Sequence, residues 1–238
     1  MNWLVSVKLP ALVAAMICEY IALTAPNPPP GKSEQAKGNR WEATSTVVKQ
    51  AIFAISFVWS IYICEIAVIL AKEAGGPLAS SILTTLLRRP HAIENINVNP
   101  IFLFGIALMV FGGVLRKSCY MILGRYFTYQ LAILKEHNLV TWGPYAVVRH
   151  PSYTAFFCVT TGNLITQFAP GGWLRESGVL DMTWAKLVMA AWVLDVLSVM
   201  TVVFRRIPVE DEMMRKEFGE QWDQWSKRTP YKLVPYVY

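Results

Sequence analysis

Residues 47–71 read VVKQAIFAISFVWSIYICEIAVILA, an apolar block in which only Lys49 and Glu65 are charged. A helix needs about 20 such residues to cross the hydrocarbon core of a bilayer. Comparable apolar blocks occupy residues 3–25, 98–115 (extending toward 123), 151–169 and 183–204. The sequence therefore predicts an all-α, polytopic membrane helix bundle with about five transmembrane helices, the first of them a true span rather than a signal peptide.

Breaks between the blocks follow proline and glycine. Residues 26–46 form a polar linker that starts with the run PNPPPG, which cannot be helical because proline lacks the backbone donor. After Gly75, Gly76 and Pro77, residues 78–89 have the pattern of a short amphipathic helix lying on the membrane. A break at residues 170–172 makes the fourth and fifth spans a tight antiparallel hairpin. Beyond Pro208, residues 209–228 are expected to form a charged amphipathic helix outside the bilayer, on the cytosolic side.

The charge and composition of the chain favour a membrane protein over a nucleic-acid-binding one. Of the 238 residues, 54% are hydrophobic and 16% charged, and the net charge is +6. No Lys/Arg-rich run or RNA-binding motif is present, so the excess charge fits the positive-inside bias and attraction to anionic lipids rather than nucleic acid. One side, interpreted as cytosolic, collects Lys32, Lys37, Arg40, Arg116, Lys117, Arg125, Lys135, Arg149, Arg205 and Arg206, whereas Lys72, Arg88 and Arg89 oppose the pattern.

Cysteines and intramembrane acids offer little chemistry by themselves. Cys18, Cys64, Cys119 and Cys158 show no CxxC spacing, so we expect free thiols and neither a disulfide framework nor a metal site. Glu19, Glu65 and Asp195 fall inside spans, where an acidic group is costly and often functional. Because no basic partner stands at a matching depth, inward-facing, hydrogen-bonded or protonated carboxyls are favoured over an ion path.

A polar segment at residues 124–153 leads directly into the fourth span. It contains Gln130, Lys135, His137, Arg149 and His150, and so two of the three histidines of the chain. The free backbone N–H groups at a helix start favour an anion. A site for a carboxylate or phosphate and an ordinary interfacial loop with aromatic anchors are equally compatible with these residues.

A second polar segment, RRIPVEDE, follows the fifth span at residues 205–212. Arg206 and Glu210 are four residues apart and share a face if the segment is helical. The planar guanidinium can hold a carboxylate by two hydrogen bonds. A simple ion pair at the membrane edge is the favoured reading from these residues alone. No HExxH, Walker or GxGxxG pattern occurs in the chain.

Two sequence stretches carry a family resemblance. They are HNLVT at 137–141 with GPYAVVRHPSY at 143–153, and RIPVED at 206–211 with the following Phe218, Gly219, Trp222, Trp225 and 227–230. In this order, separated by one helical hairpin, the chain resembles the isoprenylcysteine carboxyl methyltransferases over residues 123–235. Residues 1–123 would then be N-terminal spans, and residues 124–238 the S-adenosylmethionine-binding and catalytic half of a single membrane domain.

The resemblance implies a reaction and a set of site residues. It implies a multi-pass endoplasmic reticulum protein that methylates the C-terminal carboxylate of a farnesylated or geranylgeranylated cysteine, with the active site facing the cytosol. The substrates would be prenylated CaaX-type proteins after proteolysis, with membrane lipid around the chain. Arg206 would bind the substrate carboxylate and act with Glu210 in catalysis. The S-adenosylmethionine site would comprise Gln130, His137, Asn138, Leu139, Val140, Tyr145, His150, Pro151, Ser152, Tyr153 and Glu210, with no metal.

Departures from the family pattern leave alternatives open. Ala155 stands where a glycine is usual, and Trp222 and Trp225 replace paired tyrosines, with an interfacial role expected for both. A phospholipid N-methyltransferase would share the donor site, although an arginine favours a carboxylate over an amine. A sterol reductase with a similar His-Pro-x-Tyr stretch, and a structural membrane protein or small transporter, are further alternatives. Nothing in the sequence distinguishes a preference for farnesyl from one for geranylgeranyl.

Overall fold

The computed structural model describes residues 3–31, 44–89 and 91–238, which form helices and connecting loops without a strand. The long helices are α1 (Leu9–Leu23), α2 (Thr44–Ala74), α5 (Pro100–Leu123), α6 (Pro151–Phe168) and α8 (Thr183–Phe218). Shorter elements are η1 (Leu4–Lys8), α3 (Gly76–Leu86), α4 (Ala92–Asn95), η3 (Gly124–Tyr126), η4 (Gly143–Ala146), α7 (Trp173–Glu176), η5 (Val179–Asp181) and α9 (Glu220–Arg228). The all-α class is confirmed. Lys32, Lys37 and Arg40, assigned to the basic side, lie outside the described residues.

Four helical stretches in the described part of the chain are long and apolar enough to cross a membrane: Leu4–Leu23, Val48–Ala74, Pro100–Tyr126 and Thr183–Phe218. Their outer faces carry exposed large apolar side chains such as Phe53, Phe111 and Leu194. The fourth expected span, residues 151–169, is helical, as α6, but it is not among these four stretches because it is less apolar. Its buried face includes Asn163, Thr166 and Gln167, because α6 packs inside the bundle rather than against lipid.

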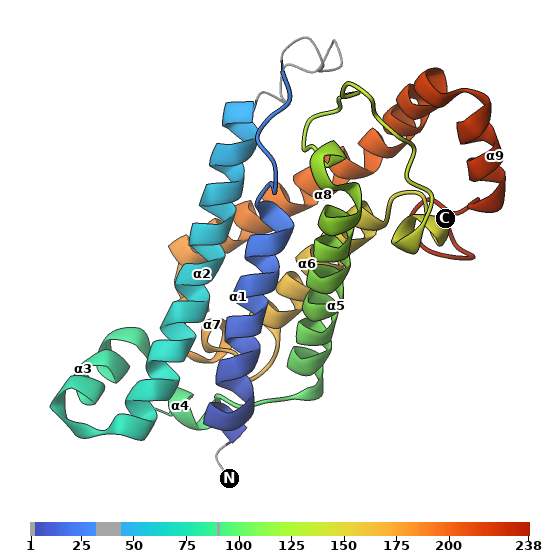
Figure 1. Ribbon diagram of the computed structural model, residues 1–238. Helices are drawn as coiled ribbons and strands as arrows, with labels where there is room; N and C mark the ends of the chain where they lie inside the picture. Colours follow the sequence, from blue (N-terminus) through green and yellow to red (C-terminus); the bar gives the residue numbers. More distant parts are fainter. Residues whose placement is uncertain (1–2, 32–43, 90) are drawn as a thin grey trace.

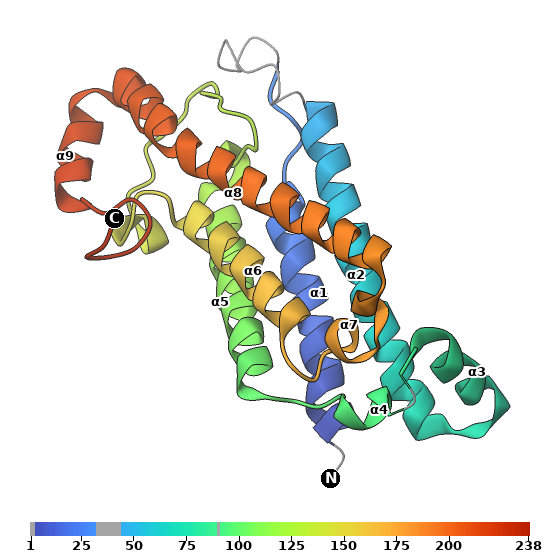
Figure 2. The ribbon, with the colours of Figure 1, turned by 180° about the vertical axis from the view of Figure 1, so that it is seen from behind.

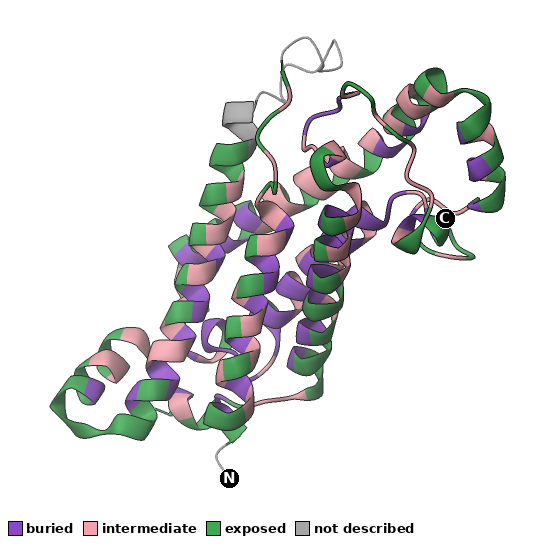
Figure 3. Ribbon diagram, viewed as in Figure 1, coloured by how far each residue is buried: buried purple, intermediate pink, exposed green. Residues whose placement is uncertain are grey.

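The bundle has two ends with different contents (Figure 1). α1, α2 and α5 stand side by side, with the N-terminus, α3 and α4 at one end and α9 and the C-terminus at the other. From behind, α8 runs obliquely in front of α6 (Figure 2). Buried residues face the space between the helices, and exposed ones face outward (Figure 3). The polar segment at 124–153 therefore lies at the same end as the C-terminal part of α8.

Small residues let α5 and α6 approach closely. A Cβ atom on Gly105 would lie 2.9 Å from the carbonyl oxygen of Gly162, and one on Gly112 would lie 2.6 Å from that of Ala155. Such small-residue seams are typical of membrane helices, because they allow backbones to pack. On another face of α5, a Cβ on Gly113 would meet Cys18 of α1 at 2.7 Å. The seam fixes the start of α6 against the end of α5.

A buried ion pair ties the end of the bundle that holds the N-terminus. Lys8, fully buried, lies 2.5 Å from Glu65, and its ammonium also donates to the carbonyls of Gly171 (2.5 Å) and Asn97 (2.8 Å). The expectation that Glu65 lacks a basic partner is therefore wrong. Hydropathy alone could not reveal the pair, because it depends on how α1 and α2 are aligned.

Helix α8 continues further than the sequence suggests. The fifth span was expected to end near residue 204, with a separate helix starting after Pro208, but α8 continues through Pro208 to Phe218, and only then does α9 begin. Its 36 residues correspond to about 54 Å, nearly twice the roughly 30 Å of a bilayer core. Part of α8 therefore extends along the end of the bundle, where it carries Arg206, Glu210 and Asp211 toward the 124–153 segment.

Candidate functional site

One cavity of about 390 Å³ joins the two polar segments to the interior of the bundle. Its polar end is lined by the loop after α5, the start of α6, α8 around Arg206, and α9. Its apolar end lies deeper, between α1, α2, α6 and α8. Ligand-binding cavities are typically a few hundred Å³, mostly apolar, with a few convergent polar groups. This cavity has both features, arranged end to end.

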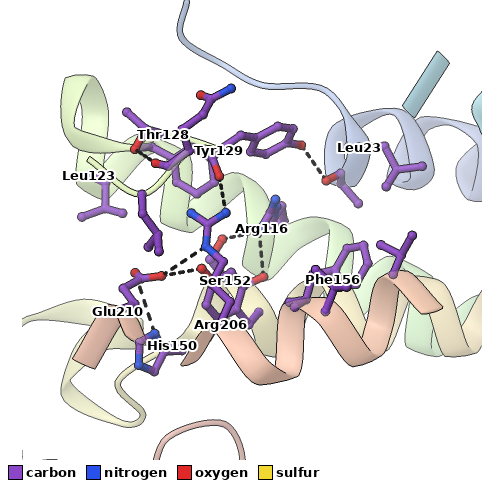
Figure 4. A pocket seen from close by; sticks show the side chains of 18 of the residues that line it. Leu23, Arg116, Leu123, Thr128, Tyr129, His150, Ser152, Phe156, Arg206 and Glu210 are labelled. Carbon is purple, nitrogen blue, oxygen red and sulfur yellow. Dashed lines mark hydrogen bonds and ion pairs between the residues drawn. The ribbon is translucent and has the colours of Figure 1, made fainter. Parts of the chain in front are cut away.

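Arg206 stands at the junction of the two ends (Figure 4). Its guanidinium donates to the carbonyl oxygen of Tyr129, and its Nε lies 3.9 Å from Glu210 Oε2. The Tyr153 hydroxyl donates to the same oxygen of Glu210. α6, α8 and the loop therefore meet on one arginine–glutamate pair, which predicts a rigidly held positive group facing the cavity.

His150 and Asp211 form a second contact between α6 and α8. His150 Nε2 lies 2.9 Å from Asp211 Oδ1, and its Nδ1 lies 3.9 Å from Glu210 Oε1. Arg149 and Lys232 also approach the Asp211 carboxylate, at 3.3 Å and 3.9 Å. In the sequence analysis Asp211 is part of the RIPVED pattern at residues 206–211, but it was given no role of its own. Here its buried carboxylate links the start of α6 to α8 and fixes which edge of the His150 ring faces Glu210.

Trp222 and Trp225 of α9 close the polar end from above the loop. Both are buried, and both line the cavity. The Trp225 indole donates to the carbonyl of Tyr145 (3.1 Å), while the Arg149 guanidinium lies 5.5 Å from the Trp222 ring. Both side chains are therefore packed between α9 and the loop, and the interfacial role expected for them stays a prediction.

Arg116 is a buried cavity residue that the sequence analysis counted only among the cytosolic charges. Its guanidinium donates to the Ser152 carbonyl (2.9 Å) and hydroxyl (2.5 Å) and to the Tyr120 hydroxyl (3.0 Å). The Phe127 and Tyr129 rings lie 5.1 Å and 5.5 Å away. Arg116 therefore joins α5, α6 and the loop. An arginine placed before the end of an apolar block was the signal that could have identified it.

His137 shows how the polar end is suited to a polar ligand. Its ring stacks on Tyr126 at 4.6 Å, and burial lowers the pKa of its imidazole below the ordinary value, partly offset by Glu217 and Glu210. Within the described residues, the buried atoms His137 Nδ1, Arg149 Nε and Trp222 Nε1 at the polar end of the cavity, and Glu19 Oε2 at its other end, lack a hydrogen-bond partner. Buried polar groups are normally satisfied. A ligand with hydrogen-bonding groups fits this end.

Most side chains in the predicted site surround this cavity. Those that line it are Gln130, His137, Leu139, Val140, Tyr145, His150, Ser152, Tyr153, Arg206 and Glu210. Asn138 is exposed, and its amide donates to the Tyr126 hydroxyl (3.4 Å) on the outside of the loop. Pro151 is buried in the first turn of α6 and is not part of the lining. Neither side chain lines the cavity, and their assignment to the site stays a prediction.

The acids within the spans have polar partners. Glu19 Oε1 accepts a hydrogen bond from Asn163 (3.0 Å), whose own oxygen accepts from Tyr62 (3.0 Å). Asp195 accepts from Gln50 (3.0 Å). Cys18, Cys64, Cys119 and Cys158 are free thiols. No group of three or more His, Cys, Asp or Glu in the described ranges is placed to hold a metal ion.

Comparisons with known proteins agree with this geometry. Residues 105–170, from α5 through the loop to the end of α6, match the model of the isoprenylcysteine carboxyl methyltransferase family. Protein-S-isoprenylcysteine O-methyltransferase B of Arabidopsis thaliana is 29% identical over 140 residues, 56% of this chain and 59% of the relative. The Schizosaccharomyces pombe and Homo sapiens enzymes of the same name are 27% identical over 166 residues (68% and 62%) and 28% over 135 residues (56% and 40%). The matches span about three-fifths of the plant relative's length, and they confirm the resemblance predicted from the sequence.

Proposed function

We propose that this chain is a member of the isoprenylcysteine carboxyl methyltransferase family, that it methylates the C-terminal carboxylate of a prenylated cysteine, and that it uses S-adenosylmethionine as the methyl donor. One observation carries the proposal. A single cavity joins a polar end that bears Arg206 and Glu210 to an apolar end between the helices. That arrangement suits a substrate with a charged head and a long hydrocarbon tail.

The polar end has the features that a carboxylate nucleophile needs. A terminal carboxyl has a pKa of about 3.5, so it is already ionised near neutral pH and needs no general base. Arg206, held by the Tyr129 carbonyl, can orient the carboxylate through its planar fork. Holding two reactants in line can lower a barrier by roughly 7–11 kcal/mol. Positioning and exclusion of water are therefore the main tasks of these side chains.

Glu210 sets how strongly Arg206 acts on the nucleophile. Its carboxylate lies 3.9 Å from Arg206 Nε and accepts the Tyr153 hydroxyl. An arginine with no acidic neighbour would attract the electrons that the carboxylate must donate. Glu210 balances part of that charge, so Arg206 orients the carboxylate without fully neutralising it. A substitution at Glu210 should therefore weaken turnover as well as donor binding.

The donor fits the same end of the cavity. S-adenosylmethionine supplies a methyl group activated on a sulfonium. The unpartnered atoms of His137, Arg149 and Trp222 are placed to bond its polar groups. Gln130, Leu139, Val140, Tyr145 and Ser152 complete this wall. The aromatic lid of Trp222 and Trp225 limits the access of water.

The hydrocarbon tail would lie between the helices. Each buried CH₂ of a lipid chain contributes about 0.8 kcal/mol. The substrates would be prenylated CaaX-type proteins after proteolysis. Arg125, Lys135, Arg149 and Arg205 stand at the end of the bundle that holds the site, which by the positive-inside rule faces the cytosol, here from the endoplasmic reticulum membrane.

Methyl transfer from labelled S-adenosylmethionine to N-acetyl-S-farnesyl-cysteine, with the purified chain in detergent, tests the proposal. We expect a base-labile methyl ester. The matched control is the amide of the same compound, which keeps the tail but lacks the carboxylate and should remain unlabelled. Phosphatidylethanolamine vesicles are a third substrate. Base-stable label in the phospholipid, with none on the prenylcysteine, would overturn the carboxylate assignment in favour of an amine methyltransferase.

A further inference from the structure

We infer that Arg116 of α5 binds the carboxylate on the amino-acid part of the methyl donor, while Arg206 serves the carboxylate that is methylated. The inference rests on the proposed function and adds a residue to it. Arg116 lines the cavity and is only 5% exposed. It lies seven residues before Leu123, the last residue of α5, and this spacing corresponds to about 10 Å of helix. A charge at such a depth in a membrane helix is costly and typically functional.

The partners of Arg116 within the protein are all uncharged. Its guanidinium donates to the carbonyl and hydroxyl of Ser152 and to the Tyr120 hydroxyl. The rings of Tyr120, Phe127 and Tyr129 lie 5.3 Å, 5.1 Å and 5.5 Å from its central carbon. Among the residues that the structure describes, no carboxylate forms an ion pair with Arg116. Buried charges are normally paired with opposite ones, and an anion bound in the cavity would supply that charge.

The other two arginines of the cavity lining differ from Arg116 because each has an acidic partner. Arg149 lies 3.3 Å from Asp211, and Arg206 lies 3.9 Å from Glu210. Apart from its histidines, the polar end of the described lining therefore has three guanidinium groups and two carboxylates. This surplus of one positive charge lies with Arg116 and favours an anionic group beside it.

The chemistry of the two reactants indicates which carboxylate Arg116 binds. S-adenosylmethionine has a carboxylate that takes no part in methyl transfer, whereas the prenylcysteine carboxylate must donate electrons. A second guanidinium on the nucleophile would weaken its attack, but one on the donor's carboxylate carries no such cost. Arg116 is also bonded to Ser152, a residue of the predicted donor site, at the start of α6 (Figure 4). Its planar fork, surrounded by aromatic rings, suits a carboxylate held by two hydrogen bonds.

The test compares two compounds that differ only in this carboxylate, S-adenosylmethionine and its decarboxylated form. Calorimetric titration of the purified chain in detergent gives a dissociation constant for each. We expect the natural chain to bind S-adenosylmethionine about 30-fold more tightly, the effect of one buried charged contact. Arg116→Met keeps an apolar stem but removes the charge. It should weaken S-adenosylmethionine binding by about the same 30-fold and leave binding of the decarboxylated compound nearly unchanged.

Lys117→Met is the matched control, because Lys117 is adjacent in the sequence but is exposed and outside the cavity lining. It should keep the full preference for S-adenosylmethionine. Arg116→Lys keeps the charge without the planar fork. It should keep part of the preference, and it replaces Arg116→Met if that variant does not fold. The preference of the natural chain itself needs no variant.

Three outcomes would overturn the inference and leave the proposed function intact. Equal weakening of both compounds in the Arg116 variants would show that this residue only joins α5 to α6. The absence of a preference in the natural chain would show that no cation holds the donor's carboxylate. A raised KM for the prenylcysteine, with the preference between donors unchanged, would assign Arg116 to the substrate instead. If the natural chain binds neither compound, the proposed function fails, and the inference fails with it.

Discussion

Two buried polar clusters, at opposite ends of the bundle, use charge in different ways. At the end holding the N-terminus, Lys8 is surrounded by Glu65 and by the carbonyls of Asn97 and Gly171, all within 2.8 Å. An ammonium has three donors, and three oxygen atoms of the protein surround this one. At the other end, Arg206 and Glu210 face a cavity whose lining contains buried atoms without partners. A closed cluster holds helices together, whereas an open one is ready to hold a ligand.

The largest expected effect is a loss of turnover when the open cluster loses its arginine. Arg206→Ala removes the group that would orient the substrate carboxylate. Losing a preorganised donor of this kind typically lowers turnover by about 10²–10³-fold, and we expect the upper end because Arg206 would be the principal group on the carboxylate. Steady-state methyl transfer and calorimetric titration with S-adenosylmethionine measure the two properties separately.

Arg205→Ala is the matched control. Arg205 precedes Arg206 in the sequence, but its side chain is exposed and is not part of the cavity lining. It should retain turnover. Loss of donor binding in folded Arg206→Ala, rather than loss of turnover alone, would contradict the role given to this residue.

The next largest effect is a loss of stability when the closed cluster loses its lysine. Lys8→Met leaves Glu65 buried without its cation, which typically costs 3–5 kcal/mol. We expect about 3 kcal/mol, the lower end of that range, because the carboxyl can take up a proton. The midpoint of thermal or denaturant unfolding in detergent measures the loss. Turnover per folded molecule should be unchanged, which is the contrast with Arg206→Ala.

Two further variants show whether the ion pair itself accounts for the lost stability. Lys49→Met removes an exposed lysine from α2 and should leave stability unchanged. Lys8→Met combined with Glu65→Leu removes both charges, and should recover most of the lost stability, because an apolar pair can replace a buried ion pair. If the double variant is no more stable than Lys8→Met alone, the carbonyl contacts rather than the ion pair explain the effect.

The same contrast shows what sequence reasoning can reach. Apolar blocks such as residues 47–71 predicted the helices, because crossing a bilayer demands about 20 apolar residues in a row. They could not reveal that Lys8 meets Glu65, since the pair depends on the relative height of two helices. Nor could they predict that α8 continues through Pro208. Proline lowers helix propensity, but packing against the loop and α6 compensates for the one lost hydrogen bond.

Only some residues of the candidate site could be predicted from the sequence, for a related reason. Residues in local patterns, such as His150 and Tyr153, could be proposed from sequence because their spacing resembles that of a family. Arg116, Trp225 and Asn163 line the same cavity from elements that only the tertiary fold brings there. Arg116 is remote in sequence from Ser152, whose carbonyl and hydroxyl it bonds. Such contacts between distant segments carry no signal in one sequence.

The smallest expected effect concerns pH at the open end. Burial lowers the pKa of His137 below its ordinary value of 6.5, so the folded protein resists protonation that the unfolded chain accepts. Stability rises with pH wherever the unfolded state binds more protons. The contribution of His137 is therefore neutral above pH 6.5, and it becomes destabilising as the pH falls from 6.5 toward the lowered pKa.

Unfolding midpoints of the natural chain and His137→Gln, measured from pH 7.5 to 5, isolate this term as the difference between two curves. The variant should lose less stability on acidification, and its donor binding should weaken less, by a few-fold at most. His91→Gln is the control, because His91 is exposed at the opposite end of the bundle, where its Nδ1 lies 3.5 Å from Glu94 Oε1. Curves for the natural chain and His137→Gln that stay parallel through this range would show that the imidazole is not buried as the structure places it, and that the open end admits water before any ligand arrives.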